Sequence, residues 1–265
     1  NDLFFIFLII IFFLLSFVTY IFSQENIRVY ILSLFFFLLT ILSSEKAIVL
    51  SLLFPLFEHL FGNIKRNWKK TPPYLIAGIS LILIYLPRLR HRQIELQGGN
   101  FSDQTIISPF LQIPIAITSY FELIFWPDQL TLYHTELVFS QISYVIRLII
   151  FIGFLGLIVF CYKKNNFLFF WLSFFIIALS PTLLPIGIAW IVAERYVYLG
   201  SLGIFVAVAW VFAKLITYKQ LRTVAITIFM AIIIALSLRT IVRNNDWSDE
   251  DHLWIAAART SPSSS

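Results

Sequence analysis

Charged residues are scarce in this sequence. They make up 12% of the 265 residues, whereas 60% are hydrophobic and the mean hydropathy is +0.89. A soluble domain carries roughly 25% charged residues, and a water-soluble fold has no way to hide so much apolar surface. Lipid must therefore solvate part of the protein, which excludes an ordinary water-soluble domain.

Disulfides, metal-ligand pairs and nucleotide-binding motifs are also missing. Cys161 is the only cysteine, so an intrachain disulfide is excluded. The four histidines are scattered, and neither a phosphate-binding Gly-rich loop nor a Gly-x-Ser-x-Gly elbow is present. We predict no metal site and no evident cofactor, and a need for a divalent metal is left open. The net charge of +5 lies in short loops, which indicates orientation in a membrane and not binding of nucleic acid.

What the sequence has instead is a series of long apolar stretches. Eight of them are long enough, or nearly so, to cross a bilayer: 3–22, 29–43, 47–61, 72–87, 141–162, 167–186, 199–217 and 223–241. About 20 helical residues cover the roughly 30 Å hydrocarbon core. The second and third stretches are short and are separated only by Ser44-Glu45-Lys46, which predicts a tight helical hairpin or a broken helix. The fold predicted is an all-α, polytopic transmembrane helical bundle of about eight spans.

A ninth apolar segment, 109–126, is interrupted by Gln112, Pro114 and Glu122 and could span the membrane, re-enter it or lie at its surface. Basic residues in short loops prefer the cytoplasmic side. The loops at 65–70, 163–164 and 219–222 are all basic. If all three are cytoplasmic, an even number of helices crosses between successive loops, and 109–126 is a re-entrant or interfacial helix. In the alternative topology 109–126 is a true span and the 63–70 loop lies outside.

Under the preferred topology, the polar features gather on the extracytoplasmic side. These are the turn with Glu45 and Lys46, the long loop 88–140, the Glu194-Arg195 pair and the tail from Arg243 onward. The working face is therefore predicted to be extracytoplasmic.

The sharpest candidate site is Glu194-Arg195-Tyr196, ahead of a helix that we expect to begin near Ser201. The planar fork of an arginine matches phosphate oxygens bidentately, and a helix start offers backbone N–H groups to an anion. The alternative is an ordinary Arg–Glu pair with Tyr196 anchored at the membrane interface.

Two further groups of charged residues also allow either a functional or an ordinary structural interpretation. A charge at the bilayer centre costs about 2.5–3.5 kcal/mol, so charged residues between apolar stretches usually face a cavity or lie at the surface. Glu45 and Lys46 therefore either line a polar cavity or form an ordinary surface turn. The basic cluster at 88–92, with Arg88 and Arg90, either attracts anionic headgroups of membrane lipid or captures a lipid-linked phosphate.

Acid and base candidates are present but unpaired in the sequence. They are Glu122, Asp128 and Glu136, and His134 lies in the same predicted outer loop as the last two. Because spacing pairs none of them, glycoside-type acid–base chemistry cannot be assigned to particular carboxylates.

Four motifs occur in an order typical of one protein family. They are Ser44-Glu45-Lys46-Ala47 followed by Pro55, then Trp126-Pro127-Asp128, then Ala193-Glu194-Arg195-Tyr196, and last Arg243-Asn244 with Trp247 and Trp254. Together they resemble the transmembrane and tetratricopeptide-repeat O-mannosyltransferases and their bacterial relatives, in the C-type glycosyltransferase (GT-C) superfamily. The resemblance covers about residues 40–262.

The resemblance implies transfer of a sugar from a polyprenyl-phosphate donor to an acceptor, such as a protein, on the extracytoplasmic face. Arg195 would stabilise the leaving phosphate, with Lys46, Arg88 and Arg90 as weaker candidates for the same group. Residues 1–241 would form part of the transmembrane domain, and 242–265 an amphipathic linker that leads to extracytoplasmic tetratricopeptide repeats. Because the chain starts at Asn1 and Met230 is its only methionine, we expect a fragment of a longer protein.

The sequence departs from the family in two places. Family members commonly have Ser-Lys-Glu where this chain has Ser44-Glu45-Lys46. The first large outer loop, whose acidic residues are expected to supply the catalytic base, has no counterpart here, so no catalytic residue is assigned in this sequence. Alternative functions are a lipid-carrier transporter or flippase, a lipid-linked polymerase or ligase, and a non-catalytic membrane scaffold with tetratricopeptide repeats.

Overall fold

The computed structural model describes residues 2–23, 26–62, 67–98, 109–127, 140–183 and 192–246. These residues form helices and no strands. The elements are α1 (Asp2–Phe22), α2 (Ile27–Ser43), η1 (Glu45–Leu52), α3 (Leu53–Leu60), η2 (Trp68–Lys70), α5 (Pro72–Gly98), α6 (Pro109–Phe125), α7 (Gln141–Lys164), α8 (Asn166–Leu183), α9 (Glu194–Thr217) and α10 (Arg222–Asp246). Here η marks a 3₁₀-helix.

Six of the described helices are long and apolar enough to cross a membrane. They coincide with six of the eight stretches predicted from the sequence, and α2 is a shorter apolar helix. Only 6% of the apolar window of α10 and 11% of that of α7 are buried inside the protein, so lipid must cover the rest. The protein is an all-α, polytopic, integral membrane helical bundle, as predicted.

The stretch predicted as a span at 47–61 is a 3₁₀-helix that continues into a short α-helix. Ser44 has an extended backbone, and its Oγ accepts a hydrogen bond from the Lys46 amide, which turns the chain back after α2. A 3₁₀-helix rises about 2.0 Å per residue and an α-helix about 1.5 Å, so η1 and α3 together reach about 28 Å. Sixteen residues thus come close to the bilayer thickness because half of them are stretched. The helical hairpin is confirmed.

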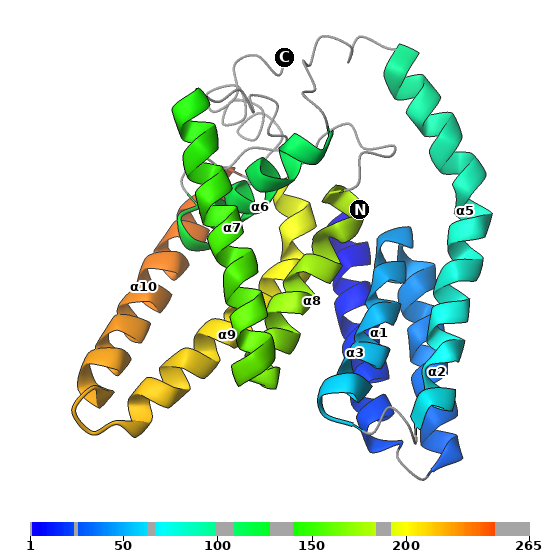
Figure 1. Cartoon of the computed structure of the whole chain (residues 1–265), viewed down its shortest axis with the longest axis horizontal. Helices are drawn as coiled ribbons and strands as arrows, with labels where there is room; N and C mark the ends of the chain where they lie inside the picture. Colours follow the sequence, from blue (N-terminus) through cyan, green and yellow to red (C-terminus); the bar gives the residue numbers. More distant parts are fainter. Residues whose placement is uncertain are drawn as a thin grey trace.

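The two ends of the bundle differ in which elements they hold (Figure 1). The lower end holds the end of α7 with Lys163 and Lys164, and the turn between α9 and α10 with Lys219. Lys70 belongs to this end too, since its Nζ donates to the Ser23 carbonyl oxygen at 3.1 Å between α1 and α2. The described basic residues of the three loops therefore share one end. Which side of the membrane that end faces stays a prediction.

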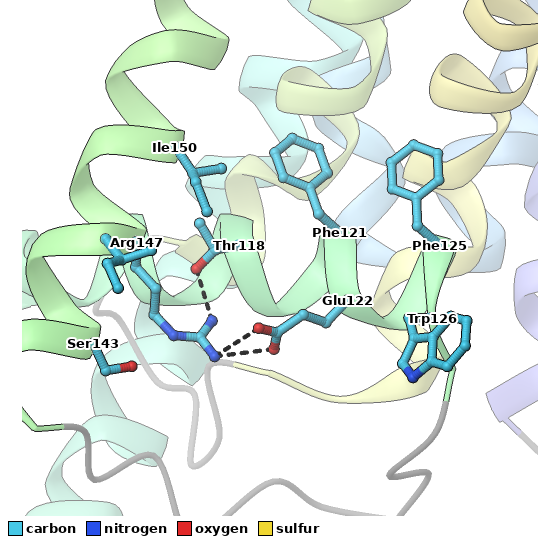
Figure 2. Close-up of a pocket in the computed structure, with 9 residues that line it drawn as sticks. Thr118, Phe121, Glu122, Phe125, Trp126, Ser143, Arg147 and Ile150 are labelled. Carbon is cyan, nitrogen blue, oxygen red and sulfur yellow. Dashed lines mark hydrogen bonds and ion pairs between the residues drawn. The ribbon is translucent and has the colours of Figure 1, made fainter.

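The upper end holds the starts of η1 and α9, the ends of α5 and α10, and the whole of α6 (Figure 1). Helix α6 runs across α7 rather than beside it (Figure 2). It packs against α7, α8 and α9, and its residues 114–120 are all buried. This arrangement agrees with a re-entrant or interfacial helix. The prediction of a loop from residue 88 is wrong for 88–98, because α5 continues as a helix to Gly98.

Helix α8 lies between two hydrophobic clusters and belongs to both. Phe170 and Phe174 pack with α1, α2, α3 and α5, where the rings of Phe54 and Tyr74 stack 3.8 Å apart. Phe175 faces a second cluster formed with α6, α7 and α9. Gly203 of α9 lets that helix approach α8 closely, because a Cβ there would collide with the Trp171 carbonyl oxygen. The interface between α8 and α9 therefore sets the position of the start of α9.

Candidate functional site

Two charged segments that are far apart in the sequence meet at the upper end. Lys46 Nζ, from η1, lies 4.0 Å from the centre of the Tyr196 ring of α9. The Arg195 guanidinium lies 5.4 Å from the centre of the same ring. Both distances are within the range of cation–π contacts. The structure thus brings together two of the motifs that the sequence singled out.

Helix α10 adds a further cation to this group. Arg243 Nη2 donates to Glu194 Oε1 at 3.3 Å, and the two side chains are only 11% and 21% exposed. We call Lys46, Glu194, Arg195, Tyr196 and Arg243 the cation cluster. Among the described residues, the cluster holds three cationic side chains and one carboxylate. Cationic side chains gathered in a largely buried place attract an anionic ligand.

The local sequence explains why Lys46 is held at this place. Immediately after it, Ala47 and Leu50 are fully buried against the helices of the first hydrophobic cluster, which anchors η1. Lys46 itself is only partly buried, and its amide is tied to Ser44. The backbone of η1 is therefore fixed while the long side chain of Lys46 reaches the neighbouring helix.

The other half of the cluster occupies the first turn of α9. Val192 and Ala193 are fully buried, and Ala193 is extended with φ −148° and ψ 143°. Alanine has no side-chain oxygen, so this N-cap makes no side-chain hydrogen bond to the first turn. The expectation that the helix begins near Ser201 is wrong, because Glu194 is already helical and Ser201 Oγ donates within the helix to the Tyr198 carbonyl oxygen. Arg195 thus lies at the helix start, where the helix dipole favours anions.

The remaining predicted site residues are not brought to the cluster by any described contact. Glu45 is the first residue of η1 and is exposed. Arg88 and Arg90 belong to α5, but their side chains lie outside the described part of the structure. Asp128 and His134 lie outside the described residues. Among the described residues, no three His, Cys, Asp or Glu side chains form a group that could hold a metal ion.

A second polar site, between α6 and α7, was anticipated in the sequence only through Glu122, one of the acid and base candidates. It is a pocket of about 340 Å³ (Figure 2), which we call the α6–α7 pocket. Its apolar lining is Phe121, Phe125, Trp126, Ile146 and Ile150, and its polar lining is Thr118, Glu122, Ser143 and Arg147. Helix α6, which forms one wall of the pocket, lies at the upper end of the bundle, as does the start of α9 (Figure 1).

Arg147 organises the polar side of this pocket. Its Nη2 donates to both carboxylate oxygens of Glu122, at 2.8 and 3.0 Å, while its Nη1 donates to Thr118 Oγ1 at 2.9 Å and to Ser119 Oγ at 3.3 Å. Thr118 Oγ1 in turn donates to backbone carbonyl oxygens of α6. The sequence did contain a signal for this site, because Arg147 is the only charged residue within the apolar stretch 141–162.

One buried side chain links the two sites. Tyr120 of α6 is fully buried in the second hydrophobic cluster, which also contains Val192, two residues before the first residue of α9. Ala193 directly precedes the first turn of α9, and Tyr120 is two residues from Glu122. The position of α6 is therefore coupled to the start of α9.

Comparison with known proteins gives a partial similarity. Over 76 residues the chain is 37% identical to the protein O-mannosyl-transferase Tmtc2 of Drosophila melanogaster, a match that covers 28% of this chain and 8% of that protein. No family model and no solved structure matches the chain. The similarity agrees with the family resemblance of the sequence motifs. The chain is an integral, multi-pass membrane protein with local similarity to an O-mannosyltransferase.

Proposed function

We propose that this chain is part of a membrane glycosyltransferase. It transfers a sugar from a polyprenyl-phosphate-linked donor to an acceptor, of which a protein is the example that the resemblance implies, on the extracytoplasmic face. The observation that carries the proposal is the meeting of Lys46 with Arg195 at the Tyr196 ring. The partial match to an O-mannosyltransferase supports the same class of reaction.

The cation cluster suits the phosphate of such a donor. When the sugar leaves a lipid phosphate, negative charge grows on the phosphate oxygens. Arg195 presents a planar fork to two of these oxygens, and Lys46 supplies a point charge from a different helix. Hydrogen-bond donors that are already in place where negative charge develops stabilise the transition state more than the ground state.

The two other charged members of the cluster have positioning roles. The ion pair between Glu194 and Arg243 connects the first turn of α9 to the end of α10. Glu194 also offsets part of the positive charge of the cluster, because Glu194 and Arg195 are adjacent in the first turn of α9. The lipid chain of the donor would remain in the bilayer beside the exposed apolar faces of the spans.

The proposal is tested with the full-length protein that contains this chain, reconstituted in lipid vesicles. Arg195→Ala and Lys46→Met are expected to lower transfer of the sugar from a polyprenyl-phosphate sugar donor by about 10²-fold each. The matched control is Lys214→Met, since Lys214 Nζ lies 5.5 Å from the centre of the Trp210 ring at the far end of α9. Near-normal turnover of both cluster variants would overturn the role of the cluster.

Arg195→Lys separates two explanations for a loss of turnover. It keeps the charge but removes the fork, so a partial recovery relative to Arg195→Ala supports phosphate binding. Equal loss in both variants, together with reduced thermal stability, would instead indicate a purely structural role. A protein that moves the lipid-linked sugar between leaflets without transferring it would contradict the transferase assignment.

A further inference from the structure

The α6–α7 pocket has features that differ from those of the cation cluster. Its two charged lining residues, Glu122 and Arg147, are paired with each other, because Nη2 of the guanidinium donates to both carboxylate oxygens. The two described charges of the pocket lining are therefore of opposite sign and bound to each other, whereas the described members of the cation cluster are three cations and one carboxylate. Because the described groups of the two sites differ, the sites favour different ligands.

From this arrangement we infer that the α6–α7 pocket binds an uncharged, polyhydroxylated ring, a hexose. The preference for a hydroxyl-bearing ring follows from the geometry of the pocket. The choice of a hexose among such rings rests on the proposed function, in which the ring is the sugar on the donor lipid or a sugar of the acceptor.

The size and lining of the pocket fit one sugar ring. Small-molecule pockets measure about 300–1,000 Å³ and combine apolar walls with a few placed polar groups. At about 340 Å³, this pocket is at the small end of that range. Its walls are mostly aromatic and aliphatic, and its polar groups come from two crossing helices (Figure 2).

The polar groups of the pocket are both fixed in place and reachable. Arg147 is only 12% exposed and is anchored by the hydroxyl of Thr118, so the guanidinium has little freedom. Glu122 is 60% exposed although it is bound to Arg147. Its carboxylate can therefore accept further hydrogen bonds from ligand hydroxyl groups, since two oxygens offer about four acceptor positions.

Aromatic side chains complete the site on its open side. Phe125 and Trp126 line the pocket and are 57% and 77% exposed. The face of an aromatic ring carries negative charge density, and the C–H groups on one face of a hexose are weakly positive. Figure 2 shows the Trp126 ring on the same side of α6 as the Glu122 carboxylate, whereas the Phe125 ring points to the other side, so a sugar ring stacked on Trp126 would lie on the side of the carboxylate.

An anionic ligand fits the pocket less well. To bind a phosphate, Arg147 would have to give up its two hydrogen bonds to Glu122, and the freed carboxylate would repel the anion. A neutral sugar ring can form hydrogen bonds with Glu122 through its hydroxyl groups while the ion pair between Glu122 and Arg147 stays intact. A free cation has no advantage in the pocket either, because Arg147 already neutralises the Glu122 carboxylate that would attract it.

The test measures binding of a soluble sugar and does not depend on transfer. The full-length protein is placed in phosphatidylcholine nanodiscs without alkyl glycoside detergents, whose head groups are sugars. Saturation-transfer NMR is then recorded with methyl α-D-mannopyranoside and, separately, with inorganic phosphate. We expect the wild type to bind the mannoside. Trp126→Ala and Glu122→Gln should each lower the affinity for the mannoside about tenfold.

The matched control is Trp68→Ala, because Trp68 is also exposed but lies on η2 at the lower end. This variant is expected to bind the mannoside normally. An additional expectation is that Glu122→Gln gains weak phosphate binding, since Arg147 then lacks its counter-charge. Melting temperatures near that of the wild type are needed to show that each variant is folded.

Three results would overturn the inference: no mannoside signal in the wild type, a signal that both pocket variants retain, or phosphate binding by the wild type that is lost in Arg147→Met. The proposed function is judged separately. Loss of mannoside binding with normal sugar transfer contradicts only the pocket assignment, while mannoside binding with transfer that is unaffected by Arg195→Ala contradicts only the role of the cation cluster.

Discussion

Arg239 and Arg243 lie one helical turn apart on α10 and connect this helix to both polar sites. Arg239 Nε donates to the Pro127 carbonyl oxygen at 2.7 Å, next to Trp126 at the rim of the α6–α7 pocket. Arg243 Nη2 donates to Glu194 in the cation cluster. Residues four apart face the same side of a helix, so one face of α10 holds both sites together.

The ion pair in the cation cluster should contribute to stability. In Arg243→Met, Glu194 keeps its charge in a largely buried place, which should lower the free energy of unfolding by roughly 3 kcal/mol. Thermal unfolding in nanodiscs measures this. The double variant Arg243→Met/Glu194→Gln should recover part of the loss, because no unpaired carboxylate remains. A double variant as unstable as the sum of its two single variants would argue against coupling between the residues.

Arg239 should hold the rim of the α6–α7 pocket. In Arg239→Met the Pro127 carbonyl oxygen loses a charge-assisted hydrogen bond, worth about 1.5–3 kcal/mol. We expect faster amide hydrogen exchange near Trp126 and weaker mannoside binding, with little change around Glu194. Arg222→Met, at the opposite end of α10, is the control. Unchanged amide hydrogen exchange near Trp126 would contradict the proposal that Arg239 holds the rim of the pocket.

Close packing of α8 against α9 should depend on Gly203. In Gly203→Ala the new methyl group collides with the Trp171 carbonyl oxygen, and we expect a loss of about 1–3 kcal/mol in stability. Gly153→Ala is a matched control, because a Cβ at Gly153 of α7 meets nothing within 4 Å. That substitution should be neutral or slightly stabilising, since alanine favours helix. Equal effects of the two substitutions would exclude helix contact as the cause.

The predicted sidedness can be tested with single cysteines. Cys161 is the only cysteine and is buried, so a Cys161→Ser background removes it from labelling. In that background, Glu45→Cys at the upper end should react with a membrane-impermeant maleimide added to intact cells. Lys219→Cys at the lower end should react only after permeabilisation. The reverse pattern would place the basic loops outside and overturn the topology.

The helical and membrane character of this protein follows from its sequence alone. Few charges and long apolar stretches leave a helical bundle as the available fold, because backbone polar groups in lipid must be satisfied within each segment. The same reasoning located Arg195 and Lys46 as candidates, since charged residues beside apolar helices are rare and costly. It placed the start of α9 too late, because the polar Glu194-Arg195 pair looks like a loop until burial of Val192 and Ala193 is known.

Only the tertiary structure decided which charges meet. Lys46 reaches Tyr196 because η1 packs against α8 and α8 packs against α9, and no spacing in the sequence encodes that order of neighbours. Arg147 and Glu122 likewise lie on different helices, and their pairing depends on α6 crossing α7. Hydropathy reports how each segment meets lipid, whereas contacts between helices depend on the shapes of the packed surfaces.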